Sequence, residues 1–92
     1  MQDVQIPVVR TTSGLCQVEG TTPRIFAGYH VDAGAAAQVN FRDGGVGGTI
    51  IATSRLGAAG TDGPKDTLRE ATAGGVYVDI VAGTPTVTVY LV

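Results

Sequence analysis

Apolar and polar residues alternate along most of this chain with a period of two, which is the spacing of a β-strand buried on one face. The rhythm predicts strands over residues 4–8, 15–18, 24–31, 35–42, 49–56, 76–81 and 87–92. In the third of these, Ile25, Ala27, Tyr29 and Val31 share one face, and Phe26, Gly28 and His30 share the other. Helical spacing is hard to find, so the pattern indicates an all-β protein.

Glycine, proline and aspartate separate the predicted strands. Residues 43–45 and 83–85 have the composition of tight turns, and residues 57–64 are predicted to form a loop. Residues 65–72 fit either a helical turn or a short edge strand, and we favour the strand. Seven or eight short strands, spaced by about ten residues, are typical of an antiparallel β-sandwich or a small jelly-roll-like barrel.

A length of 92 residues predicts one domain. We expect the sandwich to occupy residues 21–92 and residues 1–20 to form an N-terminal strand or arm region. The predicted core consists of Ile25, Tyr29, Val39, Phe41, Ile51, Val78, Ile80, Val87 and Val89. A jelly-roll or Greek-key path is the common solution for such a fold, although strand order is not readable from one sequence.

The two ends of the chain carry information about partners. Pro7 interrupts the first strand-like segment and cannot donate to a β-ladder, so this segment suits either an edge strand or an arm laid on a neighbouring molecule. Both alternatives stay open. The chain stops at Val92 inside an apolar pattern, so the last strand must be paired. The candidate interface residues are Val4, Ile6, Val8, Val9, Tyr77 and Tyr90.

Composition and charge narrow the classes of function. The net charge is −2, and the six basic residues are scattered, which disfavours nucleic-acid binding. No apolar run approaches the roughly 20 residues that cross a bilayer, and no leader pattern follows Met1, so we expect synthesis in a cytoplasm and no membrane partner. One cysteine and one histidine provide neither an internal disulfide nor a zinc site. We expect no cofactor, and we expect a homo-oligomer or docking on a larger assembly to support so small a domain.

Catalytic and metal-binding chemistry receive little support from the sequence. Cys16 and His30 form the one conceivable thiol–imidazole pair, yet their spacing does not require proximity, and a lone cysteine in a strand is usually a small buried apolar residue. A weak calcium site around Asp62 and Asp66 stays open. The glycines of residues 44–48 lead into strand-forming residues, so they predict a hairpin tip instead of a phosphate loop. We therefore do not expect an enzyme.

A carbohydrate-binding β-sandwich is one alternative class of function. Such sites use exposed aromatic platforms, for which Tyr77 and Tyr90 are the candidates. The same tyrosines are equally suited to a protein interface, where tyrosine is enriched.

From Gly28 onward the chain resembles the small β-structured virion proteins of tailed bacteriophages. The stretches that carry the resemblance are AAAQVNFRDG at residues 35–44, IIATSRL at residues 50–56, and GVYV at residues 75–78 followed by Gly83-Thr84 and Val87-Thr88-Val89. The resemblance covers about two thirds of the chain, consists of strand and turn residues, and implies no catalytic residues. It implies a decoration (cement) protein that binds the assembled major capsid protein and stabilises the head, with a neck, tail or fibre-base component as the close alternative. The expected location is the virion.

Overall fold

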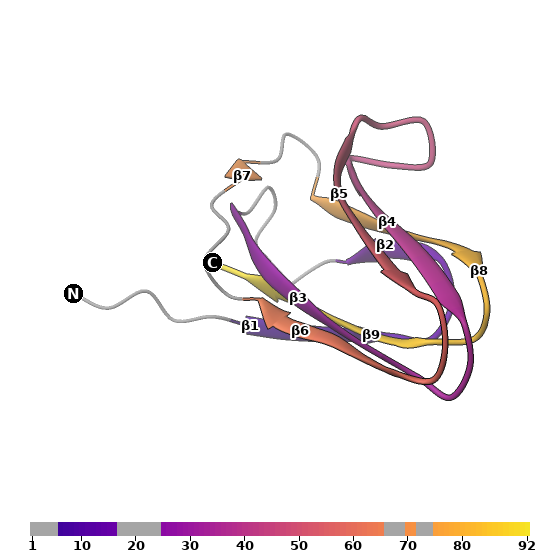
Figure 1. Ribbon diagram of the computed structural model, residues 1–92. Helices are drawn as coiled ribbons and strands as arrows, with labels where there is room; N and C mark the ends of the chain where they lie inside the picture. Colours follow the sequence, from indigo (N-terminus) through magenta and orange to yellow (C-terminus); the bar gives the residue numbers. More distant parts are fainter. Residues whose placement is uncertain (1–5, 17–24, 66–69, 72–74) are drawn as a thin grey trace.

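The computed structural model describes residues 6–16, 25–65, 70–71 and 75–92, and within them every regular element is a β-strand. The strands form two antiparallel sheets that pack as a sandwich (Figure 1). Their bounds are β1 Ile6–Arg10, β2 Gly14–Cys16, β3 Ile25–Ala33, β4 Ala37–Asp43, β5 Ile50–Leu56, β6 Gly60–Lys65, β7 Glu70–Ala71, β8 Val76–Ala82 and β9 Thr86–Leu91. The predicted all-β sandwich is confirmed.

The strand order is that of a jelly roll. The five-stranded sheet runs β1-β9-β3-β6, with β7 also paired to β3, and the four-stranded sheet runs β2-β8-β4-β5. The chain is thus folded back on itself, with β1 on β9, β2 on β8, β3 on β6 and β4 on β5. The pairs β1/β9 and β3/β6 belong to one sheet, and the pairs β2/β8 and β4/β5 belong to the other. This arrangement is that of the two Greek keys of a jelly roll.

The first and last described strands lie side by side in the five-stranded sheet. β9 sits between β1 and β3, so the pairing expected for the end of the chain is present. Ile25 and Val92 exchange two backbone hydrogen bonds, at 3.1 and 3.0 Å, which sets the phase of the ladder. Along β9 successive residues bond alternately to β3 and to β1, so Val89 and Leu91 bond to β1. Their partners in β1 alternate with Pro7 and Val9, whose backbone groups therefore face the free edge. Residues 6–10 are therefore an edge strand of their own sheet, and Pro7 lacks its N–H where no ladder bond is lost.

A β-bulge in β3 changes which residues enter the core. Phe26 pairs with Leu91 and Gly28 pairs with Tyr90, so Ala27 is the extra residue. The bulge reverses the alternation between Phe26 and Tyr29, and both side chains point inward. Phe26 is fully buried, whereas Ile25 is 39% exposed. The prediction that Ile25 belongs to the core is wrong for this reason.

The predicted loop over residues 57–64 is wrong in its second half. β6 begins at Gly60 and pairs antiparallel with β3, despite its glycines and Pro64. Opposite Tyr29 to Val31, β6 contains one extra residue, which shifts the pairing register. Gly63 lies in this bulge with a φ of 110°. An edge position tolerates this sequence because one side of the strand needs no partners. Of the predicted strand at residues 65–72, Lys65 ends β6 and Glu70–Ala71 form β7, while residues 66–69 and 72 lie outside the described residues.

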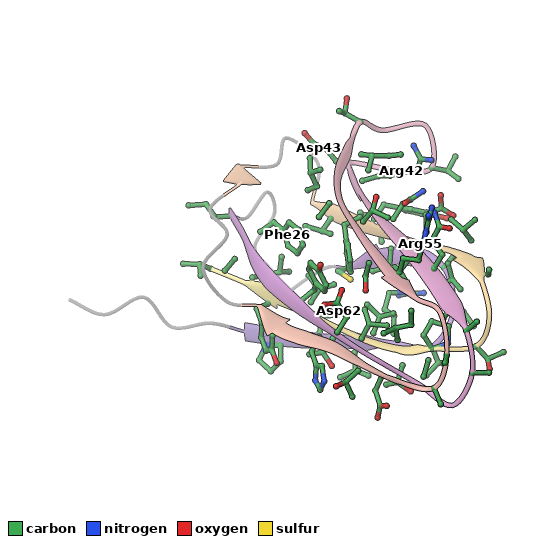
Figure 2. The ribbon with its side chains drawn as sticks, in the orientation of Figure 1. Phe26, Arg42, Asp43, Arg55 and Asp62 are labelled. Carbon is green, nitrogen blue, oxygen red and sulfur yellow. The ribbon has the colours of Figure 1, made fainter. Side chains whose placement is uncertain are left out.

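The core fills the space between the sheets. Six of the predicted core residues are buried, namely Tyr29, Val39, Phe41, Val78, Val87 and Val89, while Ile51 and Ile80 are partly buried and pack against the core. Phe26 lies between the sheets in Figure 2 and stacks on Phe41, with 5.3 Å between the ring centroids. Tyr29 stacks on the same Phe41 ring, with 4.6 Å between the centroids. These rings join the two sheets at their centre, and such aromatic pairs contribute beyond their buried area.

Candidate interaction surface

On the outer face of the five-stranded sheet, uncharged residues of β1 and β9 lie together, while the exposed Asp32 of β3 pairs with Thr86 farther along the sheet. Val9 pairs with Thr88, which pairs in turn with His30, and Pro7 pairs with Tyr90 in the next row. Their neighbours along each strand point into the core, so these side chains point outward. Val9 is 60% exposed, and Tyr90 and His30 are partly exposed. We call Pro7, Val9, Thr88, Tyr90 and His30 the β1–β9 face.

The sequence-predicted interface residues are not all brought together. Val9 and Tyr90 share the β1–β9 face, but Val8 packs against the core. Tyr77 lies between the buried Val76 and Val78 and faces outward from the four-stranded sheet, on the opposite side of the molecule. Ile6 begins β1 opposite Leu91, and Val4 lies outside the described residues. Because Tyr77 and Tyr90 are on opposite outer faces, they cannot form one aromatic platform for a sugar.

The outer face of the four-stranded sheet carries a polar network instead. Arg42 Nε lies 3.0 Å from Asp79 Oδ2 in an ion pair of partly buried side chains. Its Nη1 donates to the carbonyl oxygen of Gly48 at 3.0 Å, and Thr53 Oγ1 donates to Asn40 Oδ1 at 2.9 Å. These groups satisfy one another across strands β8, β4 and β5. Asp79, the ion-pair partner of Arg42, belongs to β8, which is distant in the sequence, so local sequence does not reveal the pair.

The β4–β5 hairpin tip is held in place by this network. Arg42 and Asp43 lie at the base of the tip (Figure 2), where the Asp43 N–H donates to the carbonyl of Thr49 at 2.9 Å. The Gly48 N–H donates to the carbonyl of Gly45, also at 2.9 Å. The tip projects Val46, which is 72% exposed. The predicted hairpin is therefore present, with an apolar side chain at its end.

One carboxylate joins the two sheets on the β5/β6 side of the sandwich. Asp62 Oδ2 accepts hydrogen bonds from Ser54 Oγ at 2.6 Å and from the Tyr29 hydroxyl at 3.2 Å (Figure 2 labels Asp62). Ser54 is buried, and its partner residue Asp62 is half-buried. Asp62 lies within the predicted loop of residues 57–64, and no local signal marks an aspartate that reaches between two sheets. Asp66, the other residue of the predicted calcium site, lies outside the described residues.

An arginine performs the corresponding role on the β1/β2 side. Arg10 donates to the backbone carbonyls of Thr12 at 3.0 Å, Ser13 at 3.3 Å and Leu15 at 3.4 Å. A Cβ at Gly14 would meet this guanidinium group, so a larger residue there would force the end of the Arg10 side chain to move. Arg10 therefore links the edge of one sheet to the edge of the other.

Cys16 is buried on the same side, and the structure separates it from His30. Burial raises the pKa of the Cys16 thiol from 9.0 to about 11, and the nearby Arg10 partly offsets the rise. The thiol therefore stays protonated at neutral pH, unlike a catalytic cysteine. His30 is on the outer face of the other sheet, so the two side chains do not form a pair.

Among the described residues no cluster of three or more metal-ligating side chains is present, and their surface has no pocket. The same residues contain no helix with the length and apolar character that a bilayer crossing requires.

Comparison of the chain with protein-family models, with curated proteins and with solved structures gives no match. The resemblance to phage virion proteins stays a prediction.

Proposed function

We propose that this protein is a structural component of a tailed-bacteriophage particle, and specifically a decoration protein that binds assembled major capsid subunits and reinforces the head. The observation that carries the proposal is the β1–β9 face, on which an exposed valine and a partly exposed tyrosine lie beside proline and threonine. Tyrosine enrichment and depletion of charge are typical of the centre of a protein interface.

Two further features support this role. The jelly-roll strand order recurs in viral capsid domains, although a fold alone does not determine a function. Val9 stands on an edge strand, so a partner can approach the β1–β9 face and the end of the sheet together. Many copies on one particle would each need only a small contact, because symmetry multiplies weak interactions.

The direct test is binding of the purified chain to capsids built from the major capsid protein of the same phage. We expect co-sedimentation with mature, expanded capsids and not with immature ones. Replacing Val9 by aspartate should weaken this binding at least tenfold, because docking would bury an unpaired charge. Val81→Asp is the matched control, since Val81 is a 52% exposed strand valine in the other sheet. Point substitution is preferred to deletion of residues 1–10, which would remove β1.

The outcomes separate the parts of the proposal. Absence of wild-type binding to either capsid form would show that the proposed function is wrong. Equal binding by Val9→Asp and wild type would show that another surface makes the contact.

A further inference from the structure

Three of the four edges in the described sandwich carry features that discourage strand pairing. β1 has Pro7 facing its free edge, β2 has three residues, and β6 contains Pro64 and a bulge at Gly63. β5 is the longest of the four edge strands, and its bulge at Ile51 leaves residues 52–56 regular. It has seven residues, Ile50–Leu56, with no proline or glycine and with one charged residue, Arg55.

The free backbone groups of β5 can be assigned from its pairing with β4. The Asp43 N–H donates to the carbonyl of Thr49, and Ile51 is the extra residue of a bulge opposite Phe41. Alternation through the ladder then directs Ala52, Ser54 and Leu56 toward β4. The N–H and C=O groups of Thr53 and Arg55 consequently point to the open edge.

We infer that β5 pairs antiparallel with β5 of a second copy of this chain, about a two-fold axis at Ser54. In this register Thr53 of each copy lies opposite Arg55 of the other, and the two pairs exchange four backbone hydrogen bonds. The four-stranded sheets then form one continuous sheet across the dimer. The inference stands without the proposed function, because the pairing occurs between free chains in solution.

Charge and spacing favour this register and this occupant. Residues 52–56 pair one to one with β4, so the strand is regular over the five positions that would meet the second copy. Thr53 and Arg55 are both exposed on the outer face, and the register places each arginine against a neutral threonine. A register centred on Arg55 would set two guanidinium groups directly opposite one another, which is unfavourable. The register centred on Ser54 thus avoids a contact between like charges.

The first test uses the wild-type chain and amide hydrogen exchange followed residue by residue. As the protein concentration rises toward roughly 1 mM, the amides of Thr53 and Arg55 should exchange more slowly by tenfold or more, because both become hydrogen-bonded in the dimer. The Val9 amide, which faces the free edge of β1, is the matched control and should not change. Exchange at Thr53 and Arg55 that is independent of concentration would overturn the inference.

The second test compares two substitutions of opposite charge at Thr53. Thr53→Glu places a carboxylate against Arg55 of the other copy and should tighten the dimer several-fold, whereas Thr53→Arg should weaken it at least tenfold. Both variants remove the Thr53 hydroxyl that donates to Asn40, so this loss cannot account for shifts of opposite sign. Sedimentation equilibrium gives the dissociation constants. An equal shift for both variants contradicts the register. Slow exchange at Thr53 and Arg55 on addition of capsids alone would assign the edge to a strand of another protein and overturn self-pairing.

Discussion

Side chains of opposite charge link the two sheets at the two open sides of the sandwich, an arginine at one side and an aspartate at the other. On the β1/β2 side, the Arg10 guanidinium group binds backbone carbonyls near the surface, the closest at 3.0 Å. On the β5/β6 side, the Asp62 carboxylate accepts a 2.6 Å hydrogen bond from the buried Ser54 hydroxyl. Each group links one sheet to the other, but only the aspartate does so through a buried side-chain partner. Because unsatisfied groups cost more when they are buried, we expect the β5/β6 side to contribute more to stability.

The largest effect is expected from Asp62→Ala. Removing the carboxylate takes the acceptor from the buried Ser54 hydroxyl and from the Tyr29 hydroxyl, and should lower the free energy of unfolding by about 3 kcal/mol. Asp62→Asn keeps an oxygen that accepts a hydrogen bond and should lose about half as much. Urea unfolding measures both. A loss below about 0.5 kcal/mol for Asp62→Ala would show that the carboxylate does not hold the two sheets together.

An alkaline titration tests the β1/β2 side. The pKa of Cys16 is about 11 in the folded protein and 9.0 without burial, so the folded state favours the protonated thiol. The resulting stability is complete below pH 9 and is lost as the pH rises through 11. The loss should be roughly 2–3 kcal/mol, at about 1.4 kcal/mol per pKa unit.

Cys16→Ala isolates this contribution. All other side chains are common to both proteins, so the difference between wild type and variant reports the thiol. The variant should be less stable at pH 8 because of the cavity, yet its stability should fall less steeply above pH 9. Parallel curves for the two proteins would indicate that the thiol is solvated in the folded state.

The smallest effect is expected from Arg10→Met. The bonds to Thr12 and Ser13 are exposed, and the bond to Leu15 is long at 3.4 Å, so we expect a loss of about 1 kcal/mol. Arg55→Met, an exposed arginine in β5, is the control and should change stability by less than about 0.5 kcal/mol at low protein concentration. If Arg10→Met costs more than Asp62→Ala, the ranking of the two sides is reversed.

Part of the surface was accessible from sequence and part was not. Val9 and Tyr90 were predicted as interface residues, and the structure places them on one outward face. Tyr77 was predicted with them but belongs to the other sheet, because strand membership depends on long-range pairing that local alternation does not encode. Asp62 was missed as a partner of Ser54 for the same reason.

By itself the sequence determined the all-β fold, most of the strand and turn positions and most of the core, and it limited the Pro7 segment to an edge strand or an arm. These follow from local rules, since a two-residue rhythm reports which side chains share a face, and proline cannot donate to a ladder. Only the tertiary structure decided the jelly-roll order, the bulge that exchanges Ile25 for Phe26 in the core, and the strand formed by the glycine-rich residues 60–65. Each of these depends on the neighbouring strand, and the neighbour of β1 is β9, at the opposite end of the described chain.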